Sequence, residues 1–304
     1  MGHQHLLQGR PERYSFIADH KDNFSVGKMC KVMQVSSSGY YDWQNRDQDI
    51  SKIKARKDLL KKIKASYDSS DSTYGSPRIT KDLQRQGIQI SRPCVARIMR
   101  KEGIQNIIRK KWKISTTDSK HKFPVCDNIL NRDFHADQIG TKWVSDITYL
   151  KTGEGWLYLT AVMDLADRKI IGWTLSEGMS AEQTSLAALE RALKARKVEN
   201  GLIFHSDRGV QYACNDFKDK LKALKIDVVQ SMSRKGNCWD NSAMESFFKT
   251  AKSEKFNRYN FKTRQEAKLC VFRYIEGWYN KGRLHSAIGY KTPGELELEM
   301  EKAA

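Results

Sequence analysis

The chain has 304 residues, with 54 Lys and Arg against 36 Asp and Glu, and residues 1–127 hold +13 of the net charge of +18 (26 basic against 13 acidic side chains). A chain of this length buries a substantial core and forms more than one domain, and its one-sided positive charge favours a polyanion such as nucleic acid as partner. It has no apolar run near the roughly 20 residues that span a bilayer, no secretory segment and no CxxC pair, which argues against a membrane protein, a zinc knuckle or a disulfide framework and predicts a cytoplasmic location.

Residues 1–48 are expected to form an N-terminal helical segment. Apolar side chains recur in it at helical spacing, and a Ser-rich turn at 35–39 precedes a group of aromatic residues. We interpret the segment as a small helical cap packed on a neighbouring domain, and a short helix-turn-helix is the alternative. The stripe that predicts its first helix consists of Val26, Met29, Val32 and Met33.

Residues 49–108 predict an all-α helix-turn-helix domain that binds DNA. A strongly basic helix covers 51–67, a second helix begins with Ser76 as N-cap and ends near Gly87, and a third runs from Ser91 to Gly103. The last helix could lie along a DNA groove, although its basic side chains could also form an ordinary solvated face. The expected DNA contacts of this domain are Arg78, Arg92, Arg97, Arg100 and Lys101.

Residues 109–140 are basic and irregular, which suits a linker that follows a phosphate backbone. From 141 to 299 the pattern changes to that of an α/β domain, a sheet layered by helices in the order β-β-β-α-β-α-β-α. Ser180 and Gln183 form a capping box for the first of these helices, which continues to about 196. The expected strands are 142–150, 155–165, 168–176, 201–207 and 226–230, of which the first three form an antiparallel meander.

Three acidic residues stand out in this α/β region. Asp146 lies inside a β-branched and aromatic run and Asp207 ends another, where a carboxylate is costly unless something positive holds it. Glu245 lies on a later helix, for which Asn237 or Asp240 is the expected N-cap. A lone Glu on a basic helix is ordinarily solvated. Helical spacing nevertheless places Glu245 on one face with Asn241, Lys249 and Lys252.

The order of these elements and acids resembles the ribonuclease-H-like catalytic core of DDE transposases and retroviral integrases. More narrowly, residues 14–299 are similar to insertion-sequence transposases of the IS family-three group, second reading frame product. One departure is that 37 residues separate Asp207 from Glu245, two more than is usual in that family. The motifs that carry the resemblance are 74–78 (YGSPR), 143–149 (WVSDITY), 205–212 (HSDRGVQY), 232–241 (MSRKGNCWDN) and 279–290 (YNKGRLHSAIGY).

The resemblance implies that Asp146, Asp207 and Glu245 form a catalytic triad that holds two Mg²⁺ or Mn²⁺ ions about 4 Å apart. Carboxylates that meet in one place repel each other unless cations neutralise them, and hard oxygen ligands suit these ions. The implied reaction cleaves element ends and joins them to target DNA. The implied partners are double-stranded DNA, an upstream-frame protein supplied separately or fused to this chain, and further copies of the chain on DNA.

Several neighbouring residues are expected to support this chemistry. Lys252 matches a basic position of the family and is expected to contact phosphate at a DNA end, as is Lys249. Asn241 orients Glu245, contacts DNA or packs its helix, and all three roles stay open. We interpret His205 as a core histidine. A structural role and DNA contact both stay open for two residues of the last motif, Arg283 and His285. A non-catalytic DNA-binding regulator left by a decayed element, and a structure-selective nuclease on the same fold, are the alternative functions.

Overall fold

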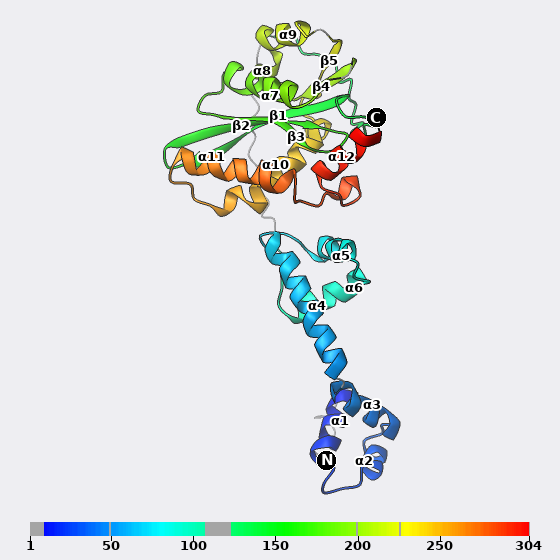
Figure 1. Ribbon diagram of the computed structural model, residues 1–304. Coiled ribbons are helices and arrows are strands. Elements are labelled where there is room, and N and C mark those ends of the chain that lie inside the picture. Colours follow the sequence, from blue (N-terminus) through cyan, green and yellow to red (C-terminus); the bar gives the residue numbers. More distant parts are fainter. Residues whose placement is uncertain (1–8, 49, 107–122, 199, 225, 304) are drawn as a thin grey trace.

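The computed structural model describes residues 9–48, 50–106, 123–198, 200–224 and 226–303. The chain forms an N-terminal group of helices, a second helical region and a sheet domain, and the long helix α4 (Ile50–Ser69) runs between the two ends of this arrangement (Figure 1). Among the described residues, no helix is both long and apolar enough to cross a membrane.

The N-terminal helices have a small core of their own. Helices α1 (Arg10–Asp19), α2 (Val26–Val32) and α3 (Ser37–Gln48) bury the side chains of Ile17, Met29, Cys30 and Tyr40 against one another. They lie at the end of α4 that points away from the sheet (Figure 1). The expected helical segment is therefore present, with a core of its own and at a distance from the sheet domain. The expected apolar stripe is only partly correct, because Val32 is 77% exposed.

The second helical region contains α4, α5 (Ser76–Arg85) and α6 (Arg92–Lys101), which pack around Ile63, Ile79 and Val95. Gly87 and Gly103 follow α5 and α6 with φ of +79° and +65°, the left-handed conformation expected of glycines that end helices. Ser76 is not the N-cap of α5. It is the first helical residue, and Gly75 precedes it as an N-cap without a side-chain bond.

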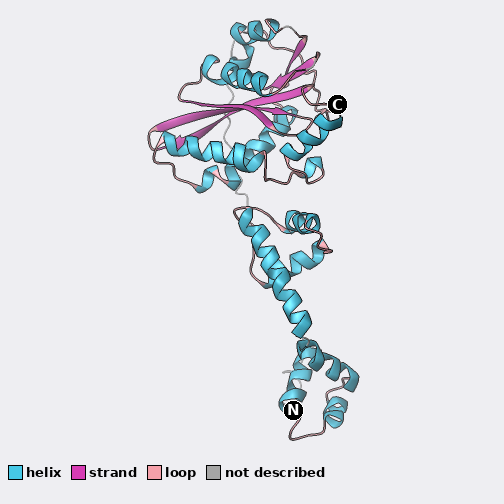
Figure 2. Cartoon of the chain, viewed as in Figure 1, coloured by secondary structure: helices cyan, strands magenta, loops and turns pink. Residues whose placement is uncertain are grey.

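The sheet domain has five strands in the order β3-β2-β1-β4-β5. The first three are antiparallel, as expected from the meander, whereas β4 and β5 run parallel to β1. Helices cover both faces of this mixed sheet (Figure 2). The strands are β1 (Lys142–Thr152), β2 (Gly155–Asp164), β3 (Ile170–Ser176), β4 (Leu202–Ser206) and β5 (Val228–Met232).

Alternating side chains supply a separate core on each face of the sheet. Trp143 packs with residues of α7 (Ala187–Ala195), α8 (Val210–Ala213) and α9 (Asn215–Lys222), while its neighbour Val144 packs with α10 (Ser242–Glu254) and α11 (Arg264–Phe272). The helix expected from Ser180 to about 196 is divided. A π-helical turn, Glu182–Leu186, precedes α7, and Cys214 separates α8 from α9 with extended backbone. Ser180 Oγ accepts a 3.4 Å hydrogen bond from the Gln183 amide, which is one of the two bonds of the predicted capping box, although Ala181 is the residue that precedes the helix.

Residues 123–140 pack on the sheet domain and are not the linker that we expected. The amides of Ile129 and Leu130 donate to Ser231 Oγ, and the Met232 amide donates to the Asp127 carbonyl, so this segment runs along the outer strand β5. Leu130 is buried in the core. The segment 123–140 therefore covers the edge of the sheet, which would otherwise present unpaired backbone groups. The other part of the expected linker, residues 109–122, lies outside the described residues.

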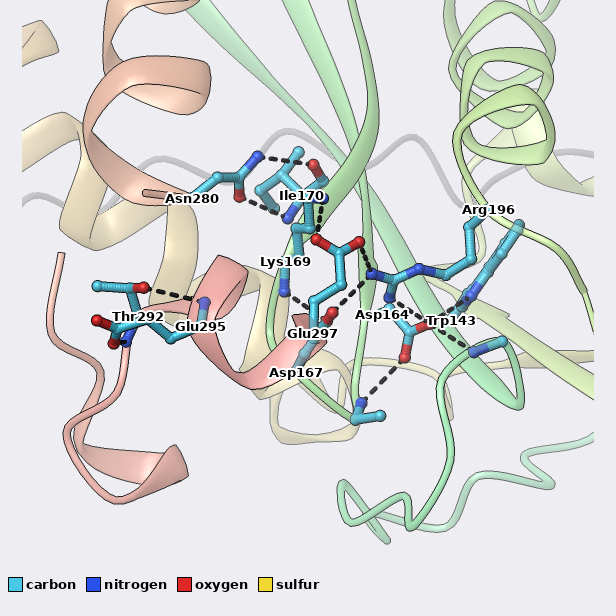
Figure 3. Close-up of polar contacts among 12 residues, drawn as sticks. Trp143, Asp164, Asp167, Lys169, Ile170, Arg196, Asn280, Thr292, Glu295 and Glu297 are labelled. Carbon is cyan, nitrogen blue, oxygen red and sulfur yellow. Dashed lines mark hydrogen bonds and ion pairs between the residues drawn. The ribbon is translucent and has the colours of Figure 1, made fainter. Parts of the chain in front are cut away.

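The C-terminal helix α12 (Pro293–Ala303) is held to the sheet domain by buried charge. Glu297 accepts from Arg196 at 2.6 Å and from Lys169 at 2.5 Å, and Arg196 also contacts Asp164 and Asp167 (Figure 3). The buried aspartates are further tied down by Trp143 Nε1 and by backbone amides. A π-helical stretch, Arg273–Tyr279, and a turn connect α11 to this helix.

Candidate active site

The strand register brings Asp146 and Asp207 together. Val144 of β1 is paired with His205 of the parallel strand β4, and Asp146 and Asp207 each follow two residues later in the chain. Strand β4 ends at Ser206, whereas β1 continues to Thr152. Asp207 therefore lies just past the carboxyl end of β4, beside the middle of β1, where Asp146 stands.

The charge of Asp207 acts on Asp146, as it does between neighbouring carboxylates. Burial raises the pKa of Asp146 well above its usual range, and the negative charges of Asp207 and, more weakly, Glu245 raise it further. A hydrogen bond of 2.8 Å from the Ile147 amide and the positive charge of Lys252 act in the opposite direction. A cluster with this balance of charges favours the binding of a cation.

A tight turn fixes Asp207. The Gly209 amide donates to Asp207 Oδ1 at 2.9 Å, and a Cβ atom added to Gly209 would lie 3.0 Å from that oxygen. Arg208 Nε donates to the Ser233 carbonyl at 2.5 Å, which attaches the turn to the end of β5. The small residue at 209 thus allows the backbone to pass close to the carboxylate.

Glu245 lies on the first turn of α10 and is exposed. Partial burial raises its pKa, and a hydrogen bond with the side chain of Cys238 lowers it. The start of α10 is attached to the first aspartate's strand because Asn241 Nδ2 donates to the Ser145 carbonyl at 3.0 Å. Ser145 in turn shares a 2.8 Å hydrogen bond with Tyr212.

The expected N-cap of α10 is wrong for both candidates. Asn241 occupies that position, without a side-chain cap. Asp240 is instead fully buried and accepts from the side chains of Arg234 and Arg132, which holds its pKa far below the usual range. This ion pair closes the loop between β5 and α10, and no spacing rule in the sequence indicated it.

Lys252 lies over an aromatic ring. Its Nζ is 4.7 Å from the centre of the Tyr149 ring, and the edge of the Trp156 ring meets Tyr149 at 5.0 Å between centroids. Burial lowers the pKa of Lys252, while the charge of Asp146 raises it. Lys249 is exposed one turn earlier on the same helix. Tyr149 belongs to a motif that the sequence singled out, but its role beside Lys252 was missed.

The three carboxylates do not form a finished metal site. Within the ranges that the structure describes, no three His, Cys, Asp or Glu side chains are arranged to hold a metal ion together. The charge of Asp207 raises the pKa of Asp146 more than the charge of Glu245 does. The side chain of Glu245 is hydrogen-bonded to Cys238. A divalent cation fits the donor chemistry of the aspartate pair, because two neighbouring half-buried carboxylates repel each other without one.

Three known domain families match this chain. An HTH-like domain family matches residues 54–112, and two integrase core domain families match residues 136–238 and 226–293. Transposase InsF of insertion sequence IS3A from Escherichia coli (strain K12) is 38% identical over 286 residues, which cover 94% of this chain and 98% of that protein. The chain belongs to the IS3-family transposases. A transposase with an integrase core is a polynucleotidyl transferase that acts on DNA.

One further relative and two solved structures are similar to this transposase. A 31 kDa protein of insertion element IS600 from Shigella sonnei is 38% identical over 279 residues, or 91% of this chain and 100% of that protein. The catalytic core of BIV integrase is 19% identical, with a TM-score of 0.40 over 54% of this chain and 97% of that one. The HTLV-2 integrase core in complex with magnesium is 14% identical, with a TM-score of 0.39 over 52% and 97%.

The remaining candidate residues of the transposase lie in different environments. On α6 the side chains of Arg92, Arg97, Arg100 and Lys101 are exposed, as expected of a face that could meet DNA. Arg78 is half-buried, and its Nε donates to the Leu284 carbonyl at 3.1 Å. One donor of this expected DNA contact is thus occupied by the chain itself.

Two histidines and an arginine of the family motifs have structural partners. His205 is fully buried between Ser231 and Ser233, with ring-to-hydroxyl distances of 2.8 and 3.2 Å, as a core histidine should be. Burial lowers its pKa to about 4. Arg283 forms a buried ion pair with Glu254, with Nη2 at 2.8 Å from Oε1. Burial and nearby arginines lower the pKa of His285 to about 3.

Proposed function

We propose that this transposase cleaves the ends of its insertion sequence and joins them to target DNA through divalent-metal-dependent phosphoryl transfer, with Asp146, Asp207 and Glu245 as its catalytic carboxylates. The observation that carries the proposal is the position of Asp146 and Asp207, which follow the last paired residues of two parallel strands, so that the charge of Asp207 raises the pKa of Asp146. Two half-buried carboxylates side by side disfavour each other's charge, so a cation between them would stabilise the pair.

Asp146 and Asp207 would hold Mg²⁺ or Mn²⁺, and Glu245 would complete the set of ligands after leaving Cys238. Two ions in such a site supply charge neutralisation, activation of an attacking oxygen and stabilisation of a leaving oxygen in an in-line displacement at phosphorus. The chain itself keeps the aspartates in place through the Ile147 and Gly209 amides. Asn241 keeps the beginning of α10, and with it the backbone of Glu245, beside β1.

Basic residues would position the DNA. Lys252 lies beside Asp146 and would contact a phosphate at the DNA end, and Lys249 offers a second charge one turn earlier on α10. The basic face of α6 would hold a more distant part of the duplex. An upstream-frame protein, or a fusion with it, and assembly of several copies on DNA complete the proposed complex.

The test uses full-length chain, the upstream-frame protein, duplex DNA with the element's ends and Mg²⁺. The variants Asp146→Asn, Asp207→Asn and Glu245→Gln remove one charge each and keep the side-chain shape. We expect each to abolish strand cleavage and joining while duplex binding stays near that of the parent chain. Asp216→Asn, on an exposed position of α9, is the control and should leave all three activities unchanged. Joining at the parental rate by any triad variant contradicts the proposal.

One observation favours the alternative of a non-catalytic DNA-binding protein. Among the described residues the third carboxylate is not arranged with the other two to hold a metal ion. This alternative predicts duplex binding with no cleavage by the parent chain, even when Mg²⁺ or Mn²⁺ and the upstream-frame protein are supplied. A structure-selective nuclease would instead cut branched DNA and never join ends.

A further inference from the structure

Two motifs far apart in the sequence lie against each other. The hydroxyl of Tyr74, in the YGSPR motif after α4, accepts a 2.8 Å hydrogen bond from the Leu284 amide and donates to the Gly282 carbonyl at 3.3 Å. Gly282 and Leu284 belong to the motif at 279–290. Tyr74 is buried, so its hydroxyl has exchanged water for these two backbone groups.

The amide, the carbonyl and the side chain of Leu284 all contact the second helical region. Its carbonyl accepts from Arg78 Nε at 3.1 Å. Its side chain is 3% exposed and packs in the same apolar core as Ile63 and Ile79, although it is more than 200 residues away from them. The YGSPR motif thus satisfies both backbone groups of a residue whose side chain fills the core beneath it.

Charged pairs surround this contact. Lys255, just after α10, lies 2.8 Å from Asp71, and Arg258 lies 3.2 Å from the same carboxylate. On the other side of the contact Arg85 of α5 is paired with Glu295 of α12. These partly exposed pairs are weak individually, but they give the contact a defined orientation.

The same segment reaches the helix that carries Glu245. Arg283, the neighbour of Leu284, makes its buried ion pair with Glu254 at the end of α10, and Tyr274 donates to the same carboxylate at 3.0 Å. Glu254 and Glu245 are nine residues apart on one continuous helix, which corresponds to about 13 Å. Tyr74 is therefore connected to the helix of Glu245 through its hydrogen bond with Leu284 and the ion pair of the adjacent Arg283 with Glu254.

We propose that residues 282–284 form a lock that fixes the helix-turn-helix-like region to the sheet domain, with Tyr74 as the positioning residue that closes it. The lock sets the distance from the exposed basic face of α6 to the carboxylates, so that DNA held by α6 reaches them at a fixed place. The YGSPR motif is then a docking element of the chain, which accounts for the engagement of Arg78 with Leu284. The catalytic part of this inference rests on the proposed function, whereas the lock itself does not.

The test measures hydrogen exchange at the Leu284 amide in the full chain. Tyr74→Phe keeps the ring and removes the acceptor, and we expect exchange at Leu284 to rise roughly five- to tenfold, as for the loss of one buried hydrogen bond. Tyr67→Phe is the matched control, because the Tyr67 hydroxyl donates at 2.6 Å to the Gln105 carbonyl inside the helical region. It should leave Leu284 unchanged. Unchanged exchange in Tyr74→Phe, or an equal rise in both variants, overturns the lock.

Exchanging the charges of the pair Arg85 and Glu295 tests the same contact without changing Tyr74, so the test does not depend on the Tyr74 variant being folded. Arg85→Glu and Glu295→Arg should each speed exchange at Leu284, and the double variant should restore it. The functional readout is strand cleavage on element-end DNA, which we expect to fall in Tyr74→Phe with duplex binding retained and to stay parental in Tyr67→Phe. Parental cleavage by Tyr74→Phe overturns its positioning role. If the parent chain cleaves no DNA but the exchange results hold, the proposed function fails and the lock stands.

Discussion

Lys252 Nζ lies 4.7 Å from the centre of the Tyr149 ring, on the side of α10 that approaches Asp146. Such a contact contributes about 0.5–2 kcal/mol, more when the ammonium is desolvated, and it restricts a side chain that otherwise has many rotamers. Tyr149 therefore orients the lysine that we propose as the contact to a DNA-end phosphate.

Replacement of Tyr149 by Leu should weaken DNA binding, because the ring that holds Lys252 is lost. We expect KM for element-end DNA to rise by up to about 30-fold with kcat nearly unchanged, the pattern of lost uniform binding. Tyr149→Phe keeps the ring and should behave like the parent chain. In a Lys252→Ala background the Leu substitution should have no further effect, and a full additional effect there argues against the pairing.

Gly172 allows helix α7 to lie directly on β3. A Cβ atom at this position would lie 2.4 Å from the Ala188 carbonyl oxygen and 2.6 Å from the Ala192 nitrogen, both backbone atoms that cannot rotate away. Gly172→Ala should lower the free energy of unfolding by about 1–3 kcal/mol, as overpacking does in other cores. Denaturant titration measures this change.

Gly277→Ala is the matched control for this substitution. Gly277 lies in the helical stretch Arg273–Tyr279, and an added Cβ there meets nothing within 4 Å. Ala in a helix is more stable than Gly by about 0.5–1 kcal/mol, so this variant should be equal to or more stable than the parent. A Gly172→Ala chain as stable as the Gly277→Ala chain contradicts close packing of α7 on β3.

His205 makes stability depend on pH. Burial lowers its pKa from 6.5 to about 4, so the folded chain keeps this ring neutral while the unfolded chain binds a proton below pH 6.5. Stability is therefore complete above pH 6.5 and is lost as pH falls toward 4, by up to about 3 kcal/mol for this residue. Its hydroxyl partners, Ser231 and Ser233, carry no charge, and the negative charge of Asp240 offsets only part of the effect of burial on the pKa.

His205→Gln should flatten the dependence of the free energy of unfolding on pH between 6.5 and 4. Part of the slope should remain, because the pKa of His285 is also lowered, to about 3. His135→Gln, at a side chain that is 80% exposed, is the control and should leave the slope as in the parent. An unchanged slope in the His205 variant means that the ring accepts a proton in the folded state.

Much of the fold follows from local patterns in the sequence. Alternation along β1 sends Trp143 and Val144 to opposite cores, and the glycines after α5 and α6 end those helices where the sequence indicates. The outward face of α6 and the apolar face of α10 also obey helical spacing. These features depend on neighbours within one or two turns, which a pattern can record.

Features that depend on long-range backbone bonding could not be predicted in this way. The segment 123–140 has no period, so its attachment to β5 through Ser231 is invisible in the sequence. Asp240 looked like an N-cap because its local surroundings suit one, but Arg234 of the same loop and Arg132 of a distant segment bind it more strongly than a helix terminus does. In the candidate site, the aspartates were identified from their strands, whereas the bond between Cys238 and Glu245 depends on a turn that the sequence left open.

Arg196 is the centre of the buried charge that attaches α12 (Figure 3). Its Nη2 lies 2.6 Å from Asp167 and 2.6 Å from Glu297, and its Nη1 lies 2.8 Å from Asp164. Arg196→Met should cost about 3–5 kcal/mol, because it leaves buried aspartates without a cation. At about 2–4 °C per kcal/mol, Tm should fall by roughly 6–20 °C in calorimetry.

Lys169→Met provides the comparison that separates burial from charge. Lys169 is 27% exposed and is paired with Glu297, which keeps its bond to Arg196 when the lysine is lost. A partly exposed pair of this kind contributes about 1 kcal/mol or less, so Tm should change by only a few degrees. An equal fall in Tm in the two variants would mean that Arg196 contributes no more than a partly exposed charge does and that the buried aspartates find another partner.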